Sequence, residues 1–457
     1  MCLLALFVTI ITSAENYNLV VGGVTVTSSN ASGVTGSNIK AFSSGVNGGK
    51  PSVVYNNTTK TLTLWNVKIE RTGSDNRAIL SGISGLTVVL KGNNYLKATG
   101  ASPVRFNAQT TLKCEVYNGT RSSDIIGGTQ DALTVGSGAT LTITDADLFL
   151  QSSNSSAFDA EGSPTLIIQN SIITAEGGGT NSNDNFGLHN YKELKINNST
   201  VTLEGASQAI NNLTGLTLGA GMYIETPAGG SYKSSMKTVV SSTGSIAKQV
   251  VFNTGINIVN NFPDANFRSW VSTNCDTNND GYLLPAEISR MQVMNVSSRS
   301  IKNLTGVEFF TALTQLICNN NSLETLNVSK NTKLTNIDCG INKLSTLNLS
   351  NNKALKMIQC YHNQIRGNGV ATFLSNLPTV TSGGIHFYAL DSSTGNAMTA
   401  AQVATAKGKG WTVMWQKTAG ATWTEYPGSD AIVIDATNFP DDNFRSYVSS
   451  NCDPNKD

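Results

Sequence analysis

Short stretches of alternating apolar and polar residues recur through the first half of the chain, as in LTVVL from Leu86 and LTITD from Leu141. Alternation with a period of two predicts β-strands. The leading leucines lie at positions 62, 86, 112, 141, 166, 194 and 216, so the steps are 24, 26, 29, 25, 28 and 22 residues. A strand repeat of about 20 to 30 residues is typical of solenoids, in which each coil buries its apolar face against the next. We therefore expect a β-solenoid over residues 17–251.

Several of these strands are followed by a polar turn residue at the same offset from the leucine. The four residues are Asn66, Asp145, Asn170 and Asn198. Asn and Asp tolerate left-handed backbone geometry and hydrogen-bond the turn with their side chains. Stacked coil on coil, they predict a structural ladder of turn residues.

A second and stricter repeat follows over residues 291–370. Its period is 21 in every column: Leu at 313, 334 and 355, Cys at 318, 339 and 360, and Asn at 321, 342 and 363. The period and the residue types resemble those of bacterial leucine-rich repeats. A degenerate first coil is expected from Met291 to Leu304, and residues 371–430 are expected to cap the C-terminal end.

The three repeated cysteines predict a column of thiols inside the repeat unit. Neighbouring coils stack at about 4.8 Å, so Cys318, Cys339 and Cys360 would lie along one buried line. Disulfides and a metal site are the alternatives. No matching His or Cys cluster accompanies the three, which favours free thiols.

Residues 256–290 predict a small helical cap that carries a calcium loop. Positions 1, 3, 5, 6, 7 and 12 of an EF-hand-type loop are filled by Asp276, Asn278, Asp280, Gly281, Tyr282 and Glu287. In such loops alternate oxygens converge on Ca²⁺, Gly allows the sharp turn and the final Glu closes the site. The alternative is an Asp/Asn-rich turn without a metal. The loop also resembles half of a dockerin, but its second copy lies 177 residues away, so we do not expect cohesin binding.

That second copy occupies residues 433–457. Its helix residues align with those after Asn261, and Asp453, Asn455 and Asp457 form a partial second metal loop. We interpret this segment as the start of a second cap-and-repeat unit, and we expect the natural protein to continue beyond Asp457.

Residues 1–14, MCLLALFVTIITSA, form an apolar run that ends in small residues. This pattern predicts a secretory signal peptide, although no Lys or Arg precedes the run. The alternative is a buried N-terminal strand. Export predicts an extracellular or cell-surface location.

The opening of the solenoid, YNLVVGGVTVT from Tyr17 and VVYNNTTKTLTL from Val53, resembles the right-handed β-helix domains of surface proteins from gut and oral bacteria. The resemblance implies a parallel β-helix fold, and some members of that group are carbohydrate-binding.

Composition narrows the function further. The net charge is +1 and only 13% of the residues are charged, so nothing points to nucleic acid, and no segment after the first is long and apolar enough to span a membrane. We expect a mostly β, non-enzymatic adhesion protein that binds polysaccharide or a host surface protein through its solenoid faces. The alternatives are a polysaccharide lyase or glycoside hydrolase and a structural stalk.

The enzyme alternative has few candidate residues in the sequence. Asp145 and Asp147 are paired carboxylates, but Asp145 falls in the turn ladder, and the three histidines lack a nucleophile nearby. No catalytic residue is therefore predicted. Acids and a base clustered on one solenoid face would favour the enzyme. Candidate sugar platforms are aromatic, and packing is their more frequent role: Trp65, Tyr95, Tyr117 and Tyr191.

Overall fold

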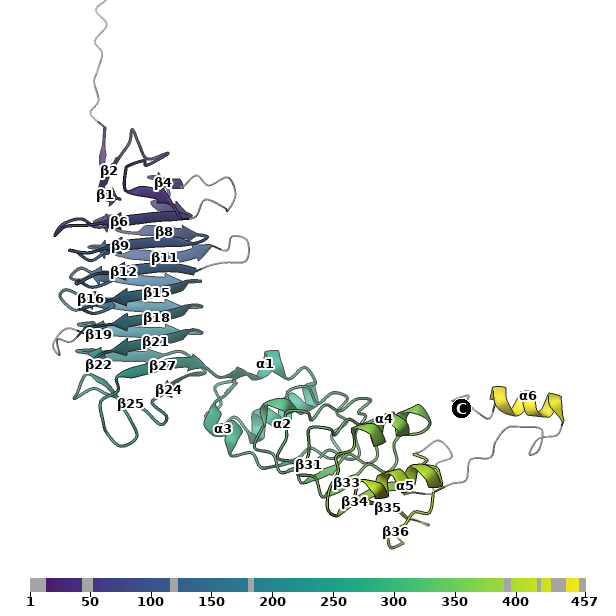
Figure 1. Cartoon of the computed structure of the whole chain (residues 1–457). Helices are drawn as coiled ribbons and strands as arrows, with labels where there is room; N and C mark the ends of the chain where they lie inside the picture. The colour runs from purple at the N-terminus through teal and green to yellow at the C-terminus, as the bar shows by residue number, and fades with distance from the viewer. Residues whose placement is uncertain are drawn as a thin grey trace, which may run out of the picture. The chain divides into compact units, whose positions relative to one another are not determined.

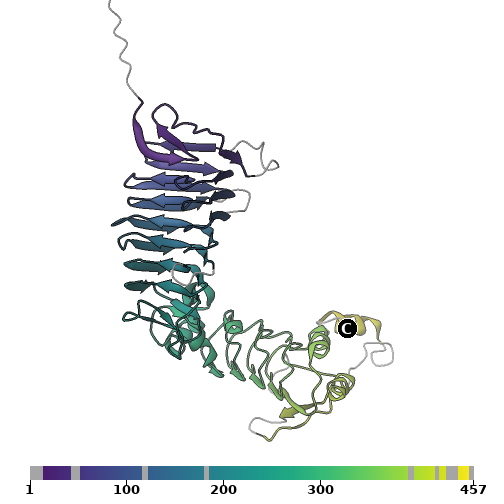
Figure 2. The same cartoon turned by 60° about the vertical axis from the view of Figure 1, so that its left-hand side comes forward.

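The computed structural model describes residues 14–42, 52–115, 122–179, 185–389, 396–416, 421–428 and 441–451. The chain divides into two compact units, Met1–Thr254 and Gly255–Asp457. The first unit is built mainly from stacked strands, and the second combines short stacked strands with helices, as Figures 1 and 2 show. The signal-peptide prediction falls almost wholly on residues outside the described ranges, as does the partial second metal loop.

The first unit is a solenoid whose coils each give one strand to three separate sheets. Sheet one contains β2 (Val24–Thr27), β1 (Asn16–Val21), β7 (Ile79–Ser81), β10 (Val104–Phe106), β13 (Leu133–Val135), β16 (Phe158–Ala160), β19 (Phe186–His189) and β22 (Gln208–Asn211). Sheet two contains β23 (Gly215–Leu218), β20 (Glu193–Asn197), β17 (Thr165–Gln169), β14 (Thr140–Thr144), β11 (Thr110–Glu115), β8 (Leu86–Lys91), β5 (Thr61–Trp65) and β4 (Ser52–Asn56). Sheet three contains β24 (Met222–Thr226), β27 (Gln249–Thr254), β21 (Thr200–Gly205), β18 (Ile172–Gly177), β15 (Asp147–Ser152), β12 (Ser122–Gly127), β9 (Asn94–Ala98), β6 (Val67–Arg71) and β3 (Ile39–Ala41).

The coils stack in parallel register, and alternate residues of each strand enter a continuous core. One inward column of sheet two runs through Leu62, Val88, Leu112, Ile143, Ile168, Ile196 and Leu218. The leucines of the sequence repeat are therefore split over two columns. Leu86 pairs with Thr110, which pairs with Leu141, whereas Leu62 and Leu112 lie two residues further along their strands. Because alternate positions of a strand share a face, this shift of two keeps every leucine inside.

Antiparallel strands close both ends of the solenoid. At the N-terminal end β1 pairs antiparallel with β7, β3 with β6 and β4 with β5, and β2 pairs antiparallel with β1 at the edge of sheet one. At the C-terminal end β27 pairs antiparallel with β21 and with β24, and a hairpin of β25 (Ser231–Lys233) and β26 (Thr238–Val240) follows the last coil of sheet one. These strands cover the parallel edges that a bare solenoid would expose.

The four predicted turn residues all adopt left-handed backbone conformations, with φ between 45° and 50°. Asp145, Asn170 and Asn198 follow paired strands on neighbouring coils, and Asn198 Nδ2 donates to Asn170 Oδ1 at 3.0 Å. Asn66 lies apart from these three. Its strand, β5, pairs with β8, and the residue that follows β8 is Gly92 instead of an Asn or Asp.

The second unit contains one seven-stranded sheet. Its parallel strands are β30 (Val293–Asn295), β31 (Gln315–Ile317), β32 (Asn336–Asp338), β33 (Met357–Gln359), β34 (Gly383–Ala389) and β35 (Trp411–Gln416), and β36 (Thr424–Glu425) is antiparallel to β35. A 3₁₀ turn, η1 (Val307–Phe309), lies between β30 and β31. The later connections are the helices α4 (Asn368–Asn376) and α5 (Ala400–Gly408), and α6 (Asp442–Asn451) follows the sheet in sequence. The sheet thus begins at Val293, within the predicted degenerate first coil.

Buried asparagines tie successive coils of this unit together. Asn342 Nδ2 donates to the carbonyls of Cys318 and Cys339 at 3.1 and 3.0 Å, and its Oδ1 accepts from Leu323 N at 3.0 Å. Asn363 makes the same contacts one coil further on. Asn396 makes comparable contacts with Ile365 N and Cys360 O from outside the 21-residue repeat.

The N-terminal cap of the second unit contains the predicted loop. Its elements are β28 (Ile256–Asn257), α1 (Ile258–Asn261), α2 (Ala265–Asn274), β29 (Tyr282–Leu283) and α3 (Pro285–Ser289). Asp264 caps α2 by accepting from Asn266 N and Phe267 N. Phe262, Phe267 and Val271 are fully buried in the core shared with the repeats.

Candidate functional site

The predicted calcium loop forms a compact turn held by its own carboxylates. Asp276 accepts from Asp280 N at 3.2 Å and Gly281 N at 2.9 Å, and Gly281 has a φ of +83°. Glu287 accepts from Thr277 N at 2.6 Å and Leu284 N at 2.9 Å. Burial alone would raise the pKa of Glu287, but these hydrogen bonds outweigh it and lower that pKa. The loop is therefore ordered by internal hydrogen bonds.

The donors of the loop suit calcium in type, because carboxylate, amide and carbonyl oxygens are its usual ligands. Within the described ranges, however, no three His, Cys, Asp or Glu side chains gather as a metal-binding group. Asp280 Oδ1 accepts from Tyr282 N, and Asn278 Nδ2 donates to Asp280 Oδ2 at 3.0 Å. The loop thus has the donor chemistry for Ca²⁺, and its carboxylates are occupied by protein donors.

The cysteine column consists of Cys318, Cys339 and Cys360, one per coil. All three are fully buried and none forms a disulfide. Burial raises the pKa of each thiol, and for Cys339 the neighbouring thiols raise it further. The thiols are therefore kept protonated and act as small apolar groups.

The exposed side of the repeat sheet ends in an aromatic cluster formed by Tyr361, His386 and Trp423. The Trp423 ring stacks on the His386 imidazole at 4.1 Å with an interplanar angle of 5°, and lies 5.5 Å from the Tyr361 ring. Burial lowers the pKa of His386, which favours its neutral form. A Cβ at Gly340 would lie 2.7 Å from the Tyr361 ring, so glycine makes room for this tyrosine.

Apolar and polar groups continue from the cluster along the same sheet. Gln359 lies opposite His386 and Asp338 opposite Gln359, and the next residue in this register is Ile317. Burial raises the pKa of Asp338, against a smaller opposing effect of Gly340 N. At the N-terminal edge Val293 is 52% exposed. The face therefore offers flat rings and apolar groups beside few charges.

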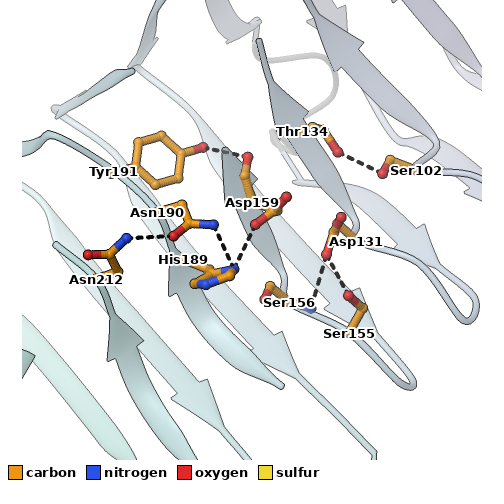
Figure 3. A network of polar contacts seen from close by, with 10 residues as sticks. All are labelled: Ser102, Asp131, Thr134, Ser155, Ser156, Asp159, His189, Asn190, Tyr191 and Asn212. Atoms are coloured by element: carbon orange, nitrogen blue, oxygen red, sulfur yellow. Dashed lines mark hydrogen bonds and ion pairs between the residues drawn. The ribbon is translucent and has the colours of Figure 1, made fainter. Parts of the chain in front are cut away.

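The solenoid contains a polar cluster that the sequence analysis did not identify (Figure 3). His189 Nδ1 lies 2.9 Å from Asp159 Oδ1, and Tyr191 Oη donates to the Asp159 carbonyl at 3.3 Å. One coil away, Asp131 Oδ1 accepts from Ser155 Oγ at 2.6 Å and Ser156 N at 3.2 Å. Burial and, second, the nearby Asp159 raise the pKa of Asp131 to about 6. This cluster of acids and a histidine lies along sheet one.

The two carboxylates considered in the sequence do not lie on one strand. Asp145 occupies a left-handed turn, whereas Asp147 begins β15. Of the candidate sugar platforms, Tyr191 is fully buried, Lys91 Nζ lies over the Trp65 ring at 4.7 Å and Lys68 Nζ over the Tyr95 ring at 5.4 Å. Tyr117 lies outside the described residues. The two partly exposed rings, Trp65 and Tyr95, thus each have a lysine over one face.

The fold and the period of the second unit define it as a leucine-rich-repeat unit. Over 71 residues the chain is 34% identical to internalin J of Listeria monocytogenes serotype 4b (strain F2365). The matched stretch is 16% of this chain and 8% of that protein. A solved structure described as "Functional domain of InlJ from Listeria monocytogenes includes a cysteine ladder" is 31% identical, covers 24% of this chain and 25% of that one, and has a TM-score of 0.23. No protein-family model matches the chain. Among the described helices, none is long and apolar enough to cross a membrane.

Proposed function

We propose that the chain is an exported, non-enzymatic adhesion protein whose repeat sheet binds a host surface protein. The similarity to internalin J over 71 residues supports a bacterial surface protein. The observation that carries the proposal is the aromatic cluster at one end of the exposed sheet face.

The cluster has the chemistry of a protein-binding hot spot. Trp and Tyr contribute large contact areas at low conformational cost, and hot spots are enriched in both. The Trp423 and His386 rings already stack, so little side-chain freedom remains to be lost on binding. Ile317 and Met357 lie on the same sheet face, partly exposed, and extend an apolar surface toward the earlier coils.

The test is binding of the labelled full chain to cultured epithelial cells, with the cells treated beforehand by trypsin or by glycosidases. Trp423→Ala should weaken binding by roughly thirtyfold, as for a hot-spot aromatic worth about 2 kcal/mol. Val259→Ala, which truncates a 67% exposed side chain on α1, is the matched control. Binding that survives trypsin, or that Trp423→Ala leaves unchanged, would contradict the proposal.

We further propose that the cap loop binds Ca²⁺ weakly, with a dissociation constant on the order of 10⁻⁴ to 10⁻³ M as in extracellular modules. The residues that would hold the ion are Asp276, Asn278, Asp280, Tyr282 and Glu287. Their donor types and their spacing support the proposal. The ion would add stability to the helical cap that covers the first repeat coil.

A further inference from the structure

Sheet one carries a column of polar side chains that runs along the solenoid from coil to coil. Arg105 lies opposite Thr134, Thr134 opposite Asp159, Asp159 beside His189 and His189 opposite Asn211. The flanking residues Val104 and Phe106 are fully buried, as are Phe158 and Leu188. Each of these short strands therefore turns one polar side chain away from the core.

Asp159 and His189 form the centre of this column. A carboxylate accepts only, so the 2.9 Å contact requires the proton on His189 Nδ1. His189 Nε2 then points elsewhere and makes no hydrogen bond to any residue of the described ranges. The side chains of Asp159 and His189 are 20% and 21% exposed, so solvent or a ligand reaches the pair.

The row continues beyond His189 through side-chain amides. Asn190 Nδ2 lies 3.3 Å from His189 Nδ1, and because both nitrogens are donors in this tautomer they are in contact without a hydrogen bond. Asn212 Nδ2 donates to Asn190 Oδ1 at 2.7 Å. Lys237 Nζ then donates to Asn212 Oδ1 at 3.0 Å. The axial row, defined as Asp159, His189, Asn190, Asn212 and Lys237, thus spans four successive levels of the solenoid. Figure 3 shows its part from Asp159 to Asn212.

On the other side of Asp159 an ion pair covers the sheet. The Arg105 guanidinium binds the Glu161 carboxylate with two hydrogen bonds, one of them 2.7 Å long, and so reaches across Thr134. Thr134 is consequently 3% exposed, and its Oγ1 donates to Ser102 Oγ. Hydrogen bonding to Arg105 lowers the pKa of Glu161. Arg105 is thereby neutralised, and the centre of the face keeps an acidic character.

Asp131 is not required by the architecture of the coil. The equivalent residues of the neighbouring coils, two positions before Val104 and Phe158, are Ser102 and Ser156. A serine satisfies this position without a charge, whereas the partly buried Asp131 has no cation among its hydrogen-bond partners and lies near Asp159. A carboxyl held partly away from water beside a like charge destabilises a fold, and such groups concentrate at functional sites.

We propose that the axial row and the adjoining Asp131 bind a neutral, hydroxyl-rich polysaccharide strand that lies along the solenoid axis. Donors and acceptors alternate along the row, as sugar hydroxyls require. The coil spacing of about 4.8 Å is close to the length of one sugar residue in an extended chain. The carboxyls of Asp131 and Asp159 disfavour a polyanion. The row consists of polar side chains, which sets it apart from the aromatic cluster of the repeat sheet.

The test measures binding of the full chain to soluble β-glucan, xylan and mannan by affinity electrophoresis, with polygalacturonate as the charged comparison. His189→Gln and Asn212→Ala should each weaken binding of the preferred neutral polysaccharide by about tenfold or more. Gln151→Ala, at an exposed position of sheet three, and Trp423→Ala should leave it unchanged. Thermal unfolding of each variant checks that the fold is retained, and Asn212→Ala keeps the test valid if His189→Gln is unstable.

Several outcomes would overturn the proposal. These are failure of all three neutral polysaccharides to bind, preference for polygalacturonate, or binding that neither variant weakens. New reducing ends released by the native chain, and lost in Asp131→Asn, would replace a binding role with glycoside hydrolysis. Failure here would leave the proposed function of the repeat sheet intact, because the two sites share no residue.

Discussion

Replacement of Asp131 by Asn should stabilise the solenoid at neutral pH. Both hydrogen bonds to Asp131 end on Oδ1, so an Asn side chain can keep them while removing the charge. The pKa rises from its ordinary 3.8 to about 6 in the folded state. At 1.36 kcal/mol per pKa unit, the charged carboxylate costs the native state up to about 3 kcal/mol.

The sign of the pH dependence follows from proton linkage. Between about pH 4 and pH 6 the folded chain holds a proton on Asp131 that the unfolded chain has released. Below pH 4 Asp131 is protonated in both states and does not lower the free energy of unfolding. As the pH rises through 6, the charged carboxylate lowers the free energy of unfolding. Asp131→Asn lacks the loss, so its advantage should be near zero at pH 3.5 and greatest above pH 7.

The assay is hydrogen exchange of the solenoid peptides, read by mass spectrometry across urea concentrations at several pH values. Peptides from β13 and β16 report the free energy of unfolding of this unit separately from the repeats. Glu204→Gln, which removes an exposed carboxyl of the solenoid, is a control for general charge effects. Parallel pH profiles for Asp131→Asn and the native chain would refute the reasoning.

Three further predictions concern the second unit. The cysteine column should resist alkylation until denaturant is added, whereas a Ser345→Cys variant at an exposed position should react in the native state; rapid native labelling of the column would contradict this. Asp276→Asn should lower the thermal midpoint more in millimolar calcium than in chelator, and equal shifts would count against a metal site. Asn342→Ala removes three buried hydrogen bonds and should cost about 2–4 kcal/mol by urea denaturation, against less than about 1 kcal/mol for the exposed Asn327→Ala.

The 21-residue repeats could be predicted because the same positions of each coil are buried. Leu334 and Cys339 recur at 21-residue steps since each fills the same buried position in a coil of fixed length. The solenoid coils vary in length at their corners, so their steps are uneven and the leucines mark two adjacent columns. The sequence therefore predicted stacked coils without their register.

The polar cluster could not be found by local motif. Asp131, Asp159 and His189 are separated by 28 and 30 residues, and only coil stacking brings them together. These separations are close to one coil, so polar residues recurring at coil steps were the signal available. The hydrogen-bond partners of Asp131, Ser155 and Ser156, belong to the neighbouring coil, so the environment of this carboxyl has no local signature. The predicted calcium loop, by contrast, is contiguous in sequence, and a hydrogen-bonded turn forms at these residues.

Because antiparallel strands close the two ends of the solenoid, the number of coils between them can vary while the cap strands stay the same. The cap strands pair only with the first and last coils, and every coil between them pairs solely with coils like itself. Insertion or deletion of one whole coil would therefore leave both caps unchanged and would lengthen or shorten the sheet-one face by about 4.8 Å. The length of the solenoid, and with it the length of its polar face, can therefore change in steps of one coil without a new fold.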